Sequence, residues 1–263
     1  MTALVSRIVV AAALLPVVFL IVWAGDWWLV ALAAVVAMVA LHELYEMTRE
    51  LRPVLLAGYA GTLAALLGAA WGPEWVLAGL FATFPLTFVF KAIGGTMPTT
   101  VAAAATVLGS AWIGLGLAHV VLIRELPEHG LLACFTVLLA VFASDTVAYA
   151  AGRLIGRHKL APRTSPGKTW EGLVAGTIAA VLVPFFALYE EEFLTVPESL
   201  VLGAVIAVAA PVGDLFESAL KRDIGVKDTG RLLLGHGGML DRLDALLFAA
   251  VVSYYVLVAF GAA

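Results

Sequence analysis

Long runs of apolar residues, separated by short polar breaks, follow one another along almost the whole chain. Each run has roughly the 20 residues that an α-helix needs to cross the hydrocarbon core of a bilayer. The runs lack the period-two alternation of membrane β-strands, which excludes a transmembrane barrel. The pattern predicts nine membrane-spanning helices, at residues 8–25, 27–46, 53–72, 75–92, 100–122, 130–152, 172–189, 199–216 and 243–262.

The composition supports a membrane protein. Of the 263 residues, 63% are hydrophobic and 13% are charged, whereas an ordinary soluble domain is about 45–50% apolar and about 25% charged. A soluble monomer of this length could not bury so much apolar surface, and the net charge of −4 offers no basic surface to a polyanion. We therefore predict an all-α, polytopic integral membrane protein that binds no nucleic acid.

The basic residues fall almost entirely on one side of the predicted membrane. Of the 15 lysines and arginines, only Arg124 falls on the opposite side. Because cytoplasmic loops carry an excess of Lys and Arg, the pattern predicts a cytoplasmic N-terminus. We expect the chain to lie in the cell (inner) membrane, with its charged loops facing the cytoplasm.

Two of these loops, 152–170 and 217–242, are long, charged and rich in glycine. Loops of that length without secondary structure are usually functional. They divide the chain into an N-terminal region of about five spans, 1–125, and a C-terminal region that carries both loops, 126–263. The C-terminal region is therefore where we expect the chemistry.

Acidic residues stand close to both loops. Asp145 and Asp214 lie near the cytoplasmic ends of their spans, where an ionisable group is costly and by default marks a functional site. Spacings of three and four residues place Asp214 on one helical face with Glu217, Ser218 and Lys221. We expect this face to contribute to the site.

A second acidic pair follows a glycine run. Asp241 and Asp244 are three residues apart at the start of a helix, so both carboxylates can face one ion, although Asp at that position also suits the helix dipole. Carboxylates without a Cys or His cluster suit a hard cation, typically Mg²⁺ held by one or two carboxylates and substrate phosphates. Mn²⁺ and a second cation remain alternatives. The glycines allow backbone N–H groups to approach phosphate, which predicts a magnesium-phosphate site.

The order of these residues resembles the defining motif of the phosphatidate cytidylyltransferases, also called CDP-diacylglycerol synthases. The motif residues are Ser218, Lys221-Arg222, Lys227-Asp228, His236-Gly237-Gly238, Asp241-Arg242 and Asp244. A second block resembles the same family and includes Ser144-Asp145, Gly156-Arg157-His158-Lys159, Ser165-Pro166 and Lys168-Thr169-Trp170-Glu171-Gly172. The resemblance is specific over about residues 144–244.

The resemblance implies an enzyme that joins CTP to phosphatidic acid, releases pyrophosphate and leaves CDP-diacylglycerol in the membrane. Asp214 and Asp241 are the expected metal ligands. The catalytic candidates are Asp145, Asp214, Lys221, Lys227, Asp228, Asp241 and Asp244. The candidates for binding substrate are Ser144, Lys159, Arg163, Ser165, Lys168, Ser218, Arg222, Gly235, His236, Gly237, Gly238 and Arg242.

Two other functions compete with this one. A CTP-dependent polyprenol or phytol kinase would transfer the terminal phosphate of CTP to a lipid alcohol. A secondary transporter would use Asp145 and Asp214 as an ion relay, but it needs no large charged loops. A homodimer is left open. At the end of the second span, the spacings of three and four residues among His42, Glu43 and Glu46 allow a polar patch near the site, but we expect an ordinary interfacial helix end.

Overall fold

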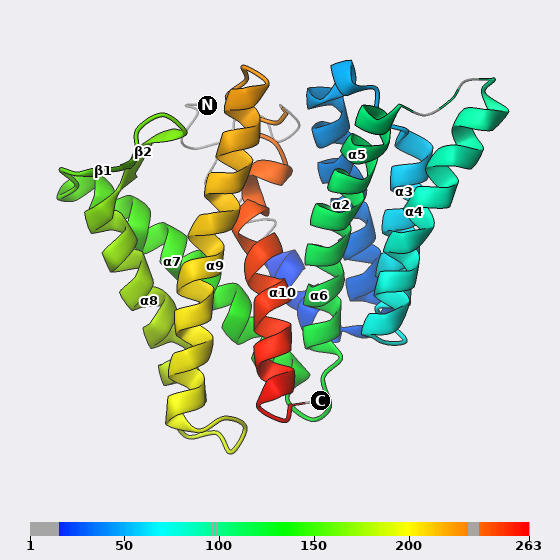
Figure 1. The fold of residues 1–263 in the computed structure, drawn as a ribbon. Coiled ribbons are helices and arrows are strands. Elements are labelled where there is room, and N and C mark those ends of the chain that lie inside the picture. Colours follow the sequence, from blue (N-terminus) through cyan, green and yellow to red (C-terminus); the bar gives the residue numbers. More distant parts are fainter. Residues whose placement is uncertain (1–15, 96, 98, 231–236, 263) are drawn as a thin grey trace. The chain divides into compact units, whose positions relative to one another are not determined.

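The computed structural model describes residues 16–95, 97, 99–230 and 237–262. The described residues form α-helices and one two-stranded sheet (Figure 1). The chain divides into two compact units, each of which is described by itself below. The first comprises Met1–Glu125 and Asp228–Arg242, and the second comprises Leu126–Lys227 and Leu243–Ala263. The segment that carries Asp241 thus belongs to the first unit.

Helices also make up the described part of the first unit. Residues 16–24 are helical. The later elements are α2 (Asp26–Met47), η1 (Arg49–Leu51), α3 (Leu55–Gly68), α4 (Pro73–Ile93), α5 (Thr100–Gly109), η2 (Ser110–Gly114), α6 (Leu115–Arg124) and η3 (Leu240–Arg242). A π-helical turn, η2, joins α5 to α6 without a break, and α3 packs along α4. The short helix η3 contacts α2, so a segment from late in the sequence packs on an early helix.

A glycine break separates the helix at 16–24 from α2. Gly25 has a φ of 69°, in the left-handed region that favours glycine. The last carbonyl groups of a helix lack hydrogen-bond donors within that helix. Here the side chain of Arg124 donates hydrogen bonds to two of them. Its Nε donates to the carbonyl oxygen of Val22 at 2.9 Å, and its Nη2 donates to that of Trp23 at 3.1 Å. One guanidinium therefore caps the helix.

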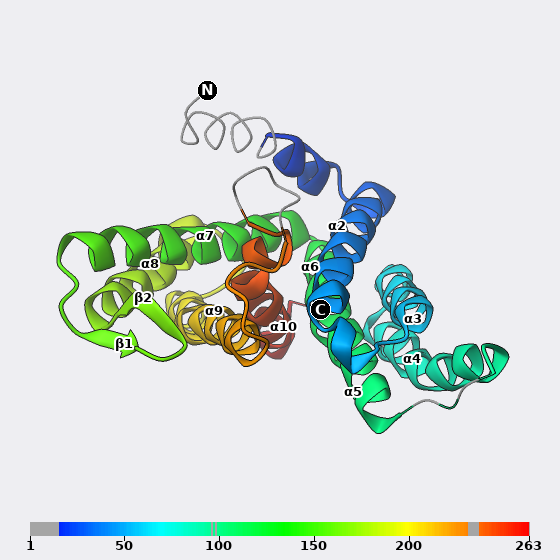
Figure 2. The same cartoon turned by 90° about the horizontal axis from the view of Figure 1, so that it is seen from above.

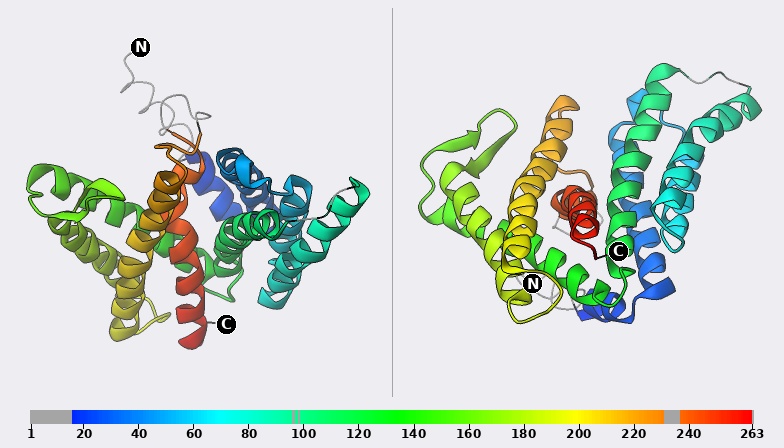
Figure 3. Two further views of the ribbon diagram at one scale, coloured as in Figure 1. Left: turned by 45° about the horizontal axis from the view of Figure 1, so that its top comes forward. Right: turned by 60° about the horizontal axis from the view of Figure 1, so that its bottom comes forward.

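The second unit is a group of four helices, of which α7 contacts the other three, with a small hairpin at one end (Figure 2 and Figure 3). Its elements are α7 (Gly130–Leu154), β1 (Lys159–Ala161), β2 (Ser165–Thr169), α8 (Trp170–Leu188), α9 (Val196–Asp223) and α10 (Asp244–Ala259). Each helix packs along the next, α7 on α8, α8 on α9 and α9 on α10. The hairpin follows α7 and leads directly into α8.

The helices fit the predicted membrane protein. Every predicted span from residue 27 onward coincides with a described helix. Among the described residues, six helices are long and apolar enough to cross a membrane, and α3 and α10 are shorter. Many large apolar side chains, such as Trp28, Phe81 and Leu154, are exposed on the surface of the chain, as expected where lipid replaces water.

Two details of the prediction need correction. The loop 152–170 was expected to be irregular, but most of it forms the antiparallel hairpin β1–β2, with Pro162 opening the three-residue turn. Hairpin loops of this length are common. The loop 217–242 begins later than expected, because α9 continues to Asp223. Arg222 is therefore helical, together with Ser218 and Lys221, which their spacing from Asp214 already placed on a helical face.

Candidate active site

The base of the hairpin is fastened to the start of α8, which fixes the position of Lys168. Thr169 ends β2 and caps α8, since its Oγ1 accepts the N–H of Gly172 at 3.1 Å. Residue types of this kind at an N-cap satisfy a helix donor that otherwise lacks a partner. The N–H of Trp170 donates to the carbonyl of His158 at 2.9 Å, and Nδ1 of His158 lies 2.7 Å from Oε1 of Glu171. Lys168 is therefore carried on a well-anchored strand.

Lys168 forms an ion pair with Asp214 of α9. Its Nζ lies 2.6 Å from Oδ2 of Asp214, and both side chains are largely but not fully buried. Ser218 Oγ donates to the other oxygen of Asp214 at 3.4 Å. Asp145 of α7 interacts electrostatically with both Asp214 and Lys168. Three predicted site residues, from α7, β2 and α9, are thus brought together within the second unit.

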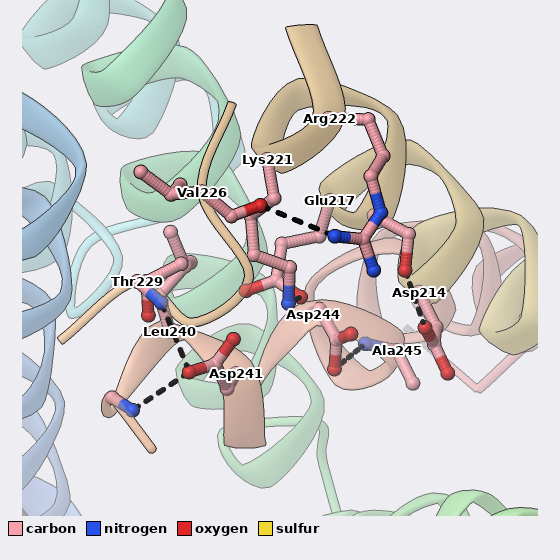
Figure 4. Close-up of polar contacts among 12 residues, drawn as sticks. Asp214, Glu217, Lys221, Arg222, Val226, Thr229, Leu240, Asp241, Asp244 and Ala245 are labelled. Atoms are coloured by element: carbon pink, nitrogen blue, oxygen red, sulfur yellow. Dashed lines mark hydrogen bonds and ion pairs between the residues drawn. The ribbon is translucent and has the colours of Figure 1, made fainter. Parts of the chain in front are cut away.

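Two further acids extend this group. Glu217, one turn from Asp214 on α9, is 1% exposed and lies 2.6 Å from Nζ of Lys221. Asp244 at the start of α10 is also buried and interacts with both Asp214 and Glu217, while its Oδ1 accepts the N–H of Ala245 at 2.9 Å (Figure 4). We call Asp145, Asp214, Glu217 and Asp244 the carboxylate cluster. The predicted face of α9, with pairs four residues apart, is confirmed.

Asp241 lies in the first unit and is held by backbone. Its Oδ2 accepts the N–H of Gly238 at 2.7 Å and the N–H of Thr229 at 3.2 Å (Figure 4). Gly237, with a φ of 80°, turns the chain into this arrangement. The sequence predicted only that the glycines allow backbone N–H groups to approach phosphate, and in the structure the N–H of Gly238 donates to a carboxylate.

The donor atoms near Asp214 fit a hard cation. They are carboxylate oxygens, which Mg²⁺ prefers, and Oδ2 of Asp214 already lies 2.6 Å from a positive charge, the ammonium group of Lys168. Within the described residues, no group of three or more acidic, histidine or cysteine side chains is arranged to hold a metal ion. A magnesium ion bound by one or two carboxylates and by substrate phosphates needs no such group.

The other candidate residues are distributed more widely. Arg222 ties the hairpin to α9, because its Nε donates to the carbonyl of Thr164 at 3.2 Å. Ser144 is buried in α7, Ser165 is half-buried in β2, and Arg242 is exposed. Four exposed side chains make no hydrogen bond or ion pair with any described residue: Lys159, Arg163, Lys227 and Asp228. Gly235 and His236 lie outside the described residues.

One acid was misjudged from the sequence. Glu43 was expected at an ordinary interfacial helix end together with His42 and Glu46, but only those two are exposed. Glu43 is buried, and its Oε2 accepts the N–H of Leu240 at 3.0 Å and the hydroxyl of Thr229 at 3.4 Å. The signal was available, because Glu43, like Asp214, is a costly acid in an apolar helix.

Comparisons with known proteins agree with the motifs. The model of the cytidylyltransferase family matches residues 5–260. The chain is 35% identical to a protein of Mycobacterium bovis called phosphatidate cytidylyltransferase, over 87% of this chain and 79% of that one. Proteins of the same name from Mycobacterium leprae and Staphylococcus saprophyticus are 34% and 31% identical, over 90% and 94% of this chain and 81% and 94% of theirs. None of these names supports a kinase or a transporter.

Proposed function

The chain belongs to the cytidylyltransferase family, and from this premise we propose that it is a phosphatidate cytidylyltransferase, which makes CDP-diacylglycerol from CTP and phosphatidic acid. One observation carries the proposal: relatives of that name match this chain over most of their own length as well as most of its length. The cations and carboxylates gathered on α9 and the hairpin supply the charges that this reaction needs.

The reaction exchanges one phosphoanhydride partner for another. A phosphate oxygen of phosphatidic acid attacks the α-phosphorus of CTP, the bond from that phosphorus to the oxygen bridging to the β-phosphate breaks, and pyrophosphate leaves with the bond electrons. Such transfers need little covalent help from a protein, so positioning and charge stabilisation dominate. The protein's part is to hold two polyanions in line against their mutual repulsion.

We assign the hairpin to the lipid phosphate. It carries Lys159, Arg163 and Lys168 with no acid among them, which suits a phosphate monoester that arrives from the bilayer. Lys168 already holds the anionic group of Asp214 at 2.6 Å, and an incoming phosphate would offer it a second anionic partner. Ser165 on the same strand supplies a hydroxyl donor.

We assign the nucleotide to the segment after α9, where Lys227 and Arg242 are exposed. Lys221, a catalytic candidate, is paired with Glu217, so we assign it to fixing charge beside the site. Asp214 and Asp241 are the proposed ligands of Mg²⁺ or Mn²⁺, with Asp145, Asp228 and Asp244 as further candidates. Such an ion would neutralise part of the triphosphate charge when bound.

The decisive experiment uses CTP labelled at either end. Purified protein in detergent, given phosphatidic acid and Mg²⁺, should move label from the α-phosphate of CTP into the organic phase and release label from the γ-phosphate as pyrophosphate. A lipid kinase would give the opposite result, with γ-label in the lipid. Asp223, which is exposed at the end of α9, provides a control variant, Asp223→Asn, that should stay active.

We also propose nine spans, a cytoplasmic N-terminus and a site that faces the cytoplasm of the inner membrane. Cysteines introduced at the exposed positions Glu128 and Glu191 should react with an impermeant reagent outside intact cells, whereas cysteines at the exposed positions Gly167 and Gly225 should not. The native Cys134 is buried, so it should add little background. Labelling of Gly167→Cys from outside would place the hairpin away from cytosolic CTP.

A further inference from the structure

Glu43 is an acid buried in an otherwise apolar helix. It is 7% exposed, whereas His42 beside it and Glu46 one turn later are exposed. A buried carboxylate is costly unless hydrogen bonds compensate for its lost hydration. The hydrogen bonds that Glu43 accepts are therefore expected to matter for the structure around it.

The bonds of Glu43 reach the segment that carries Asp241. Oε2 of Glu43 accepts the N–H of Leu240, the residue directly before Asp241, and the hydroxyl of Thr229. Thr229 is held at both ends, because its own N–H donates to Oδ2 of Asp241. Two short routes, one through Leu240 and one through Thr229, thus connect Glu43 to the Asp241 carboxylate within the first unit.

The backbone around Glu43 is shaped to admit its carboxylate. A Cβ atom added to Gly238 would lie 2.5 Å from Oε2 of Glu43, and one added to Gly230 would lie 2.5 Å from Oε1. Real Cβ atoms do not approach oxygen so closely, so both glycines allow the chain to pass against the acid. Gly238 also donates its N–H to Asp241. The segment therefore packs on Glu43 and orients Asp241 with the same residues.

We propose that Glu43 is a positioning residue, whose carboxylate fixes the orientation of Asp241 and thereby the binding of the metal-nucleotide. The proposal rests on the proposed function, which makes Asp241 a ligand of that complex. Glu43 does not touch substrate in this account. It acts through Leu240 and Thr229, and its effect should fall on CTP and the metal rather than on the lipid.

The kinetic test separates hydrogen bonding from packing. Glu43→Gln keeps an oxygen that can accept from Leu240 and Thr229, whereas Glu43→Met keeps a similar volume and removes the acceptor. We expect kcat/KM for CTP to fall at least about tenfold in Glu43→Met, since buried donors lose their partner, and to stay within about threefold of wild type in Glu43→Gln. The KM for phosphatidic acid should change less than about twofold in both. Glu46→Met, on the exposed side of the same helix, is the matched control.

A second variant tests one route alone. Thr229→Val removes the hydroxyl that bonds Glu43 and keeps the N–H that bonds Asp241, so we expect a loss in kcat/KM for CTP between those of Glu43→Gln and Glu43→Met. Equal kinetics for the Gln and Met variants of Glu43, or a loss in Glu46→Met as large as in Glu43→Met, would overturn the proposal.

Hydrogen exchange measures the positioning without any turnover. In Glu43→Met, the amides of Thr229, Gly238 and Leu240 should exchange faster than in wild type, while amides of α8 in the second unit should not change. Unchanged exchange at all three amides would overturn the proposal. If the wild-type protein fails to transfer CMP, the proposed function fails, and the exchange experiment still decides whether Glu43 holds the segment of Asp241.

Discussion

Asp214 and Asp241, the two acids assigned to the metal, are held in opposite ways. Asp214 is bonded by side chains, Lys168 at 2.6 Å and Ser218 at 3.4 Å. Asp241 is bonded by backbone N–H groups of Gly238 and Thr229. A lysine can change its rotamer when a phosphate or a metal ion arrives, whereas a backbone amide moves only with its whole segment.

This difference suggests that the surroundings of Asp214 and those of Asp241 have different roles in the site. The partner of Asp214 is a charge that can be exchanged for another charge, which suits a position where substrates arrive and pyrophosphate leaves. The two backbone N–H groups that bond Asp241 among the described residues are neutral dipoles that fix its orientation before anything binds, which is the kind of preorganisation that lowers barriers in charge-stabilising sites. We therefore expect substitutions near Asp214 and substitutions near Asp241 to change the kinetics for different substrates.

The largest effects should come from the acids themselves. Asp214→Asn and Asp241→Asn should each lower kcat at least about hundredfold, as does the removal of a charge-stabilising group in other enzymes, while the protein remains in the membrane. Transfer of α-label from CTP measures the loss. If Asp241→Asn were as active as the control Asp223→Asn, the proposed role of the backbone-held acid would be wrong.

Lysine variants should give a smaller effect and distinguish the substrates. Lys168→Ala should raise the KM for phosphatidic acid more than that for CTP, and Lys227→Ala should do the reverse. Loss of a charged hydrogen bond of about 1.5–3 kcal/mol corresponds to roughly 10- to 150-fold. Initial rates with each substrate varied in turn provide the measurement.

Two alternative outcomes for Lys168→Ala are informative. A lower kcat with both KM values unchanged would assign this lysine to the leaving pyrophosphate. A rise confined to the KM for CTP would show that the hairpin, rather than the segment after α9, binds the nucleotide.

The smallest effect should appear at the tether of the hairpin. Arg222→Lys loses the bond from Nε to the carbonyl of Thr164, and exposed substitutions of this kind change stability by about 0.5 kcal/mol or less, or roughly twofold. Because Arg163 precedes Thr164 in the turn, trypsin should cleave after Arg163 about twofold faster in the variant. Cleavage after Arg157, before the hairpin, should keep its rate.

Local periodicity made much of this architecture predictable. The thickness of a bilayer sets the length of an apolar run, so the apolar helices from residue 27 onward could be located from the sequence. The 3.6-residue repeat likewise placed Ser218 beside Asp214 and Lys221 beside Glu217 on α9. The motifs then indicated the family that the comparisons support.

Long-range pairing could not be predicted in the same way. Glu43 bonds Thr229 and Leu240 across 186 and 197 residues, and no periodicity in one sequence relates such positions. Nor does the charge pattern indicate that Lys168 pairs with Asp214 rather than with another acid. The hairpin was missed because its strands have only three and five residues, and Pro166 in β2 is atypical of a strand.

The cap that Arg124 provides has a consequence for the time course of assembly. It satisfies the carbonyls of Val22 and Trp23, which lie 102 and 101 residues earlier in the chain. A ribosome adds about 5–20 residues each second, so roughly 5–20 seconds separate the synthesis of this helix from that of its cap. During that interval water or other groups must solvate the two carbonyls. The helix at residues 16–24 can therefore be capped only late in assembly, after Arg124 at the C-terminal end of α6 has been synthesised.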